Sequence, residues 1–98
     1  MKYGLRITAE ADVDILAAID WYESKRLGLG NNFSEEVFDY FEYLQKQALS
    51  HEKKFGENHE LPMKRFPYVI VYCLDGNTVV ILGVINTYQH PEKKQSRK

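Results

Sequence analysis

The hydrophobic pattern of the first half of the chain predicts two helices. A first apolar stripe recurs at intervals of three and four residues within a helix from about Ala9 to Arg26: Ala11, Ile15, Ala18, Ile19 and Tyr22. A second stripe, within a helix that runs to about Ala48, consists of Phe33, Val37, Phe41 and Leu44, reinforced by Phe38 and Tyr40. Two amphipathic helices joined by a few residues predict an antiparallel helical hairpin.

A short strand precedes this hairpin. Residues Tyr3 to Thr8 alternate enough between apolar and polar side chains to form it. Thr8 is then placed to cap the first helix, with Glu10 and Asp12 in its first turn. A hydroxyl at the cap accepts a hydrogen bond from a free N–H group, and acidic side chains favour the positive end of the helix dipole. The first helix is therefore expected to begin directly after the strand.

Glycines and asparagines mark the connection between the two helices. Gly28 and Gly30 are expected to end the first helix and turn the chain. Asn31 or Asn32 is expected to cap the second helix. Glu35, three residues after Asn32, completes the spacing of a capping box.

The second half of the chain changes to strand periodicity. Ser50–Glu60 is charged and poorly patterned, so we expect an exposed connection there. Lys64–Phe66 and Tyr68–Leu74 are predicted as two short strands, because a proline between them limits pairing. Asp75–Gly76 predicts a two-residue turn. Thr78–Asn86 is nearly continuous Val, Ile and Leu, as in a strand at the sheet centre.

The predicted order is β-αα-βββ, which is an α+β fold. The helical hairpin is expected to pack on one face of a small, mainly antiparallel sheet and to leave the other face partly open. That open face is where function would be sought. Residues 1–98 are expected to form a single domain, with 87–98 as a flexible basic tail.

Composition narrows the cellular context. The net charge is −1, but residues 1–60 carry 7 Lys or Arg against 12 Asp or Glu, whereas residues 61–98 carry 6 against 2. A nucleic-acid binder would usually be more basic overall. The single cysteine, Cys73, cannot form an internal disulfide, and the longest run of apolar residues and glycine, Val79–Ile85, is far too short to span a membrane. We therefore expect a cytoplasmic protein with no membrane partner.

Five stretches taken together resemble the RelE/ParE toxin superfamily. Those that resemble its helical hairpin are Ala11–Ile15, Asp20–Glu23 and Gly28–Phe33. Arg65–Tyr72, followed by Val79–Asn86 and a polar segment with a histidine, is similar to its sheet. The resemblance covers nearly the whole chain in the right order.

This resemblance implies a type II toxin–antitoxin system, of the kind often called plasmid stabilisation. The expected partner is a small antitoxin, with no cofactor. RelE-like members cut mRNA in the ribosomal A site with basic and aromatic side chains, whereas ParE-like members lack that set and poison DNA gyrase. This chain lacks the dense Lys/Arg set of RelE-like members, so gyrase is the favoured target. A ribosome-dependent endoribonuclease and a non-catalytic binding module stay open as alternatives, as does a homodimer.

Three residues would carry the chemistry if the chain were RelE-like. By the resemblance, the Arg65 guanidinium would clamp the scissile phosphate and His90 would protonate the leaving 5′-oxygen. Tyr88 would stack on a base. Each has a plainer explanation: an ion pair for Arg65, an exposed polar tail for His90 and packing at a sheet edge for Tyr88.

Other candidate sites have less support. His51 and His59 have no partner at metal-ligand spacing, so no metal is expected. Cys73 alternates with apolar strand positions and is expected in the core rather than as a nucleophile. Trp21 and Tyr22 are expected to pack within the helical hairpin.

Overall fold

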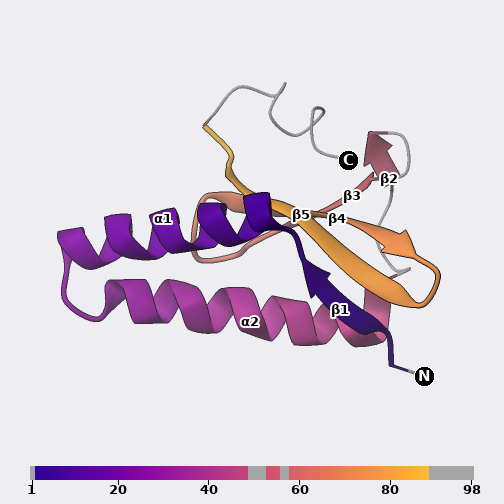
Figure 1. Cartoon of the computed structure of the whole chain (residues 1–98). Coiled ribbons are helices and arrows are strands. Elements are labelled where there is room, and N and C mark those ends of the chain that lie inside the picture. The colour runs from indigo at the N-terminus through magenta and orange to yellow at the C-terminus, as the bar shows by residue number, and fades with distance from the viewer. Residues whose placement is uncertain (1, 49–52, 56–57, 89–98) are drawn as a thin grey trace.

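The computed structural model describes residues 2–48, 53–55 and 58–88. For residues 53–55 it describes the backbone only. Five strands and two helices lie in these ranges (Figure 1). They are β1 (Gly4–Ile7), α1 (Ala9–Lys25), α2 (Leu29–Gln47), β2 (Lys53–Phe55), β3 (Asn58–Pro62), β4 (Tyr68–Asp75) and β5 (Thr78–Asn86).

The strands form one sheet in the order β1-β5-β4-β3-β2. Only β1 and β5 pair in parallel among these strands, and the other neighbours are antiparallel. α1 and α2 lie side by side as an antiparallel hairpin against one face of the sheet (Figure 1). The predicted α+β class, with a helical hairpin on a mainly antiparallel sheet, is confirmed.

A β-bulge in β5 divides its side chains between the two faces of the sheet. Val71 pairs with Gly83 and Tyr72 with Ile81, so Leu82 is an extra residue on the β5 side. An extra residue reverses the alternation of the side chains that follow it. Val84 accordingly joins the core under the helices, and Ile85 packs on the far face.

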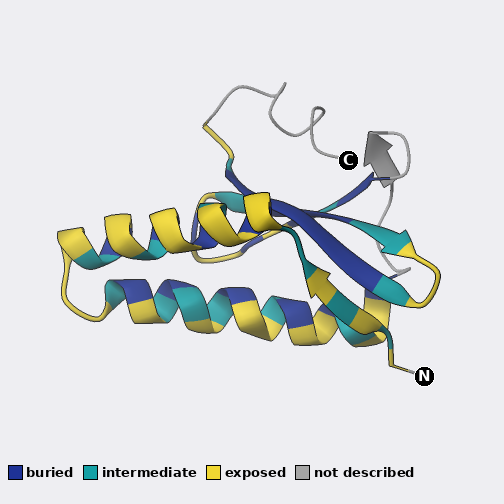
Figure 2. Cartoon of the chain, viewed as in Figure 1, coloured by how far each residue is buried: buried dark blue, intermediate teal, exposed yellow. Residues whose placement is uncertain are grey.

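The main core lies between the helical hairpin and the sheet. The predicted stripes of both helices are buried there at Ala11, Ile15, Ala18, Tyr22, Phe33, Val37, Phe41 and Leu44 (Figure 2). The strands contribute Ile70, Tyr72, Val79, Ile81 and Val84. The predicted core stripes are therefore correct except at Phe38, which is 48% exposed, and Ile19 and Tyr40 are partly buried at the edge of this core.

The face of the sheet away from the helices was predicted to be partly open, and at its centre this is wrong. Val69, Val71, Val80, Leu82 and Ile85 form a second apolar cluster there, and each is at most 4% exposed. Alternation along a strand shows which face a side chain takes but not what covers that face. The centre of this face is therefore buried.

The start of α1 follows the sequence prediction, but the start of α2 does not. Thr8 Oγ1 accepts a hydrogen bond from the Ala11 N–H at 3.2 Å, as an N-cap does. α2 begins at Leu29, with Gly28 at its N-cap in the left-handed region at φ 88°. The predicted caps Asn31 and Asn32 therefore lie inside the helix.

Glu23 of α1 takes over the capping of α2. Its Oε1 accepts hydrogen bonds from the N–H groups of Gly28 and Gly30 at 3.1 and 3.0 Å, and its Oε2 accepts from Gly28 at 2.9 Å. The carboxylate thus satisfies free N–H groups and favours the positive helix end. Gly30 does not end α1 but lets the helices approach, since a Cβ there would lie 2.6 Å from the Ile19 carbonyl oxygen.

Three further predictions in the second half of the chain are corrected. Within the predicted exposed connection Ser50–Glu60, the structure has β2 and the start of β3, and it buries Asn58 and His59. Lys64–Phe66 is a bend rather than a strand. The tight turn is Gly76–Asn77, because Asp75 and Thr78 pair with each other. Polar residues can be buried in a strand, and periodicity alone misses this.

Candidate functional site

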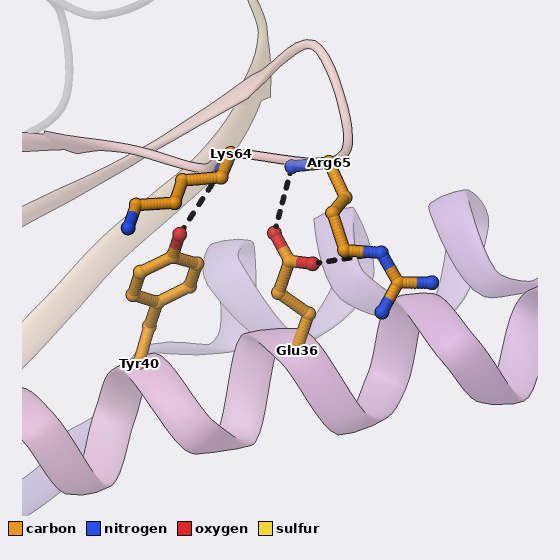
Figure 3. A network of polar contacts seen from close by, with 4 residues as sticks. All are labelled: Glu36, Tyr40, Lys64 and Arg65. Carbon is orange, nitrogen blue, oxygen red and sulfur yellow. Dashed lines mark hydrogen bonds and ion pairs between the residues drawn. The ribbon is translucent and has the colours of Figure 1, made fainter.

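Arg65 lies in the loop between β3 and β4, which is tied to α2. The Lys64 N–H donates to Tyr40 Oη at 3.0 Å, and the Arg65 N–H donates to Glu36 Oε2 at 3.1 Å (Figure 3). The two α2 acceptors lie one helical turn apart, so they bind consecutive N–H groups of the loop. The backbone at Arg65 is therefore fixed by the helix.

The Arg65 side chain is paired with the same carboxylate. Its Nε lies 3.6 Å from Glu36 Oε1, and the guanidinium carbon lies 6.0 Å from the centre of the Phe66 ring. The Arg65 side chain is 66% exposed, whereas that of Glu36 is 11% exposed. Glu36 thus partly neutralises the cation that a phosphate clamp would need.

An aromatic cluster holds the base of this loop. Tyr22, Phe33, Phe66 and Tyr68 contact one another with ring centres 4.8–6.1 Å apart, mostly edge to face. Burial, followed by the neighbouring Tyr68, raises the pKa of Tyr22 above its ordinary value. The loop is thus anchored in the core at Phe66, directly after Arg65.

Arg65 lines a groove beside α2 of about 590 Å³, which we call the α2 groove. Its walls are Glu36, Asp39, Tyr40, Tyr43, Leu61, Pro62, Lys64 and Arg65. Two acidic and two basic side chains balance the charge around apolar and phenolic surface. This composition does not concentrate positive charge on an anionic substrate.

Tyr88 belongs to another groove. The N–H and hydroxyl of Thr87 both donate to the Pro67 carbonyl oxygen, at 2.8 and 3.1 Å, and fix the turn that carries Tyr88. The Tyr88 side chain is 87% exposed and borders a groove of about 570 Å³ beside α1, which we call the α1 groove. Tyr88 and Arg65 therefore line different grooves, and His90 lies outside the described residues.

The other chemical candidates do not form a reactive centre. His59 is 4% exposed and stacks on Tyr72, with ring centres 4.9 Å apart. The Tyr72 hydroxyl donates to the Ala48 carbonyl oxygen at 2.6 Å, and burial raises its pKa above the ordinary value, with Tyr43 adding to the shift. Burial also raises the pKa of the half-buried Cys73 thiol, which disfavours the thiolate a nucleophile needs.

The described residues hold neither a cluster of metal ligands nor a helix that could span a membrane. Within 2–48, 53–55 and 58–88 there is no group of three or more His, Cys, Asp or Glu placed to hold a metal ion. In the same part of the chain, neither helix combines the length and apolar character needed to cross a bilayer.

The α1 groove was not predicted from the sequence. Its walls include Val13, Ala17, Trp21 and Asn86, and Trp21 is 54% exposed rather than packed inside the hairpin as predicted. Tyr22 is buried, as expected. The available signal was the excess of apolar residues on α1 outside its buried stripe, such as Val13 and Leu16, which are 65% and 55% exposed.

Comparison with solved structures identifies the fold. A chain in the structure of the chromosomal ParDE TA (toxin–antitoxin) system from P. aeruginosa matches with a TM-score of 0.75 at 19% identity, over 87% of this chain and 96% of that chain. A chain in the toxin–antitoxin complex RelBE2 from Mycobacterium tuberculosis matches with a TM-score of 0.60 at 22% identity, over 88% and 99%. No family model and no curated protein matches the sequence.

These matches show that the chain shares its fold with a chain of the ParDE system and with a chain of the RelBE2 complex. Of the two structures, the ParDE chain has the higher TM-score.

Proposed function

We propose that this chain is the toxin of a bacterial type II toxin–antitoxin pair, acting in the cytoplasm and neutralised by a cognate antitoxin. The fold shared with a chain of a ParDE system and a chain of RelBE2 supports this proposal. The higher TM-score of the match to the ParDE chain favours DNA gyrase as the target.

The pairing of Arg65 with Glu36 is the observation that favours gyrase over RNA cleavage. Phosphodiester cleavage needs cationic and proton-transferring groups that converge on one phosphate. Among the described residues, Arg65 is partly neutralised by Glu36 and Tyr88 lies in the other groove. Such an arrangement suits binding to a macromolecule better than catalysis.

A ribosome-dependent endoribonuclease is the second candidate. The observation in its favour is the 66% exposure of the Arg65 side chain, which leaves much of the guanidinium open to a phosphate. In this reading Arg65 would clamp the phosphate, Tyr88 would stack on a base and His90 would act as the general acid.

Gyrase inhibition is tested with the purified protein. We expect it to inhibit supercoiling of relaxed plasmid by gyrase in a concentration-dependent way, and its expression without the antitoxin to arrest growth. Co-expression of the antitoxin from the adjacent reading frame should restore growth. Normal supercoiling at a large molar excess of the protein would refute the gyrase target, and unimpaired growth of the native host without antitoxin would favour the non-catalytic binding module.

RNA cleavage is tested by mapping mRNA ends on translating ribosomes. The gyrase proposal predicts no codon-phased cuts. If such cuts occur, Arg65→Ala and His90→Ala should each abolish them, whereas Arg26→Ala, an exposed arginine at the end of α1, should not. Full cleavage by both site variants would remove these residues from the mechanism.

A further inference from the structure

The helical hairpin carries exposed apolar side chains on its outer face, which is turned away from the sheet. In α1, Val13 and Leu16 lie three residues apart on the side opposite the buried stripe, and they are 65% and 55% exposed. In α2, Phe38 lies away from the buried stripe of that helix and is 48% exposed. We call Val13, Leu16 and Phe38 the outer hairpin patch.

The members of this patch lie at similar levels along the hairpin. α1 and α2 run antiparallel and side by side (Figure 1). Gly30 sets their register, because a Cβ there would lie 2.6 Å from the Ile19 carbonyl oxygen. Phe38 is eight residues after Gly30 and is therefore about level with the α1 residue eight before Ile19. Val13 and Leu16 are two and five residues from that level, which is about 3 and 8 Å along the helix axis.

The middle of the hairpin carries charge of one sign. Residues 9–24 of α1 and 29–45 of α2 contain nine Asp or Glu and no Lys or Arg. The lysines of the two helices, Lys25 and Lys46, stand in their last turns. A partner that covers the outer hairpin patch therefore meets acidic side chains around it.

Three of these carboxylates border the outer hairpin patch. Asp20 follows Leu16 by four residues, which places both on one face of α1. Glu35 and Glu42 stand three residues before and four after Phe38, which places them on its face of α2. All three acidic residues are exposed, and within 2–48 and 58–88 their carboxylates have no hydrogen bond or ion pair. The patch thus has an apolar centre and an acidic rim.

This composition restricts what can cover the patch. A nucleic acid or an anionic membrane would bring further negative charge. A second copy that docked through the same face would place carboxylates opposite carboxylates, and like charges across an interface repel. A basic protein surface with apolar side chains complements both the rim and the centre.

We propose that the outer hairpin patch docks on a basic, partly apolar surface of the protein that the toxin inhibits. Apolar side chains of that protein pack on Leu16 and Phe38, and its Lys or Arg side chains pair with Asp20, Glu35 and Glu42. An enzyme that acts on DNA presents basic surface to the phosphates, so gyrase offers a surface of this kind. The identity of the partner rests on the proposed function, whereas its chemistry rests on the patch.

The first experiment tests the chemistry with a probe of defined composition. A labelled amphipathic helix of Leu and Lys, about five turns long, is titrated into the whole protein and followed by fluorescence anisotropy. We expect saturable binding that weakens between about 0.1 and 1 M salt, because exposed charges are screened. Leu16→Ala should weaken binding about tenfold and Asp20→Asn about threefold, since the first removes apolar contact and the second removes a rim charge.

Two control variants make the same chemical changes elsewhere. Leu27→Ala removes a leucine that is 92% exposed in the connection between the helices, and Asp75→Asn removes an exposed carboxylate at the end of β4. Both should bind the probe as the unaltered protein does. Equal effects of test and control variants, or no effect of either, would refute the patch, because non-specific attraction does not depend on position. A probe with Glu in place of Lys should not bind, and equal binding would refute the charge argument.

The second experiment separates the patch from the proposed function. In the gyrase supercoiling assay, Leu16→Ala and Asp20→Asn should each raise the inhibitory concentration by about the factor found with the probe, and the controls should not. If all variants inhibit equally, gyrase does not dock on the patch and the toxin role stands. If the unaltered protein never inhibits gyrase but the probe results hold, the patch binds a basic surface and the assignment to gyrase is wrong.

Discussion

At the scale of single residues, Glu36 accepts a hydrogen bond from the Arg65 N–H and forms an ion pair with the Arg65 side chain. This double contact changes the interpretation of Arg65. The sequence indicates a cation next to a strand. It does not show that a carboxylate 29 positions earlier lies beneath that cation, because this depends on how α2 packs against the loop. The two roles considered for Arg65, an ion pair and a phosphate clamp, can be distinguished by mutation.

We expect Arg65→Ala to lower the free energy of unfolding by less than about 1 kcal/mol, because an exposed ion pair contributes little. Glu36→Ala should lower it by about 1–2 kcal/mol, because the Arg65 N–H loses its acceptor. Urea denaturation of both variants measures the difference. A larger loss for Arg65→Ala than for Glu36→Ala would contradict the view that Glu36 fixes this loop.

The raised pKa of Tyr72 predicts how the stability of the fold changes at alkaline pH. Burial raises its pKa in the folded state above the ordinary value of 10.0, so folding favours the protonated phenol. The resulting stability is fully present below about pH 10 and is lost as the pH rises further, because the unfolded chain ionises first. Unfolding free energies between pH 7 and 11 should therefore fall above pH 10.

Tyr72→Phe is the matched variant for this prediction. At pH 7 it should lose about 0.5–1.5 kcal/mol with the hydrogen bond to the Ala48 carbonyl oxygen. Its loss of stability above pH 10 should be smaller than that of the unaltered protein. An equally steep loss in the variant would assign the alkaline transition to other groups, such as Tyr22, whose pKa burial also raises.

At the scale of elements, a polar contact between the two helices of the hairpin sets where the second helix begins. Glu23 of α1 caps the N-terminus of α2 through the N–H groups of Gly28 and Gly30. Both apolar stripes were correctly predicted, because they follow from the periodicity of each helix alone. The prediction that Asn31 or Asn32 caps this helix, with Glu35 in a capping box, was wrong. A carboxylate of the preceding helix satisfies N–H groups at the start of α2 instead, and the local sequence spacing around Asn32 does not indicate this contact.

Two glutamates therefore give a direct test of the cap. Glu23→Ala should lower the free energy of unfolding by about 1–2 kcal/mol, in the range found for lost helix caps. Glu23→Gln should lose less, because its amide oxygen can still accept the hydrogen bonds. Glu35→Ala is the control, and as an exposed residue it should leave stability nearly unchanged. Thermal unfolding by circular dichroism measures all three, and a greater effect at Glu35 would restore the capping box.

At the scale of the whole molecule, the described surface offers apolar side chains that nothing in this single chain explains. Val13, Leu16 and Trp21 on α1 are more than half exposed, and Tyr88 faces the same groove as Val13 and Trp21. A chain of 98 residues buries a limited core, and a partner that covers such side chains adds stability through binding. The proposed antitoxin would thus stabilise the fold of this chain in addition to neutralising it.

The melting temperature should therefore depend on the antitoxin concentration. At a free antitoxin concentration 100 times Kd, the folded state gains about 2.7 kcal/mol, and for a domain of this size about 1 kcal/mol shifts Tm by about 4–8 °C. Differential scanning calorimetry over a range of antitoxin concentrations measures the shift. A Tm that stays constant throughout would contradict specific binding to the folded chain.

The sequence by itself determined the two helices, the strand Thr78–Asn86 and the α+β class, because each follows from a local period in which apolar residues recur. The tertiary structure alone decided the capping by Glu23, the burial of His59, the pairing of Arg65 with Glu36 and the separation of Arg65 from Tyr88. These features join residues far apart in the chain, and packing sets their distances. The α1 groove has the same origin, since residues of α1 and residues of β5 beyond the end of β1 line it together.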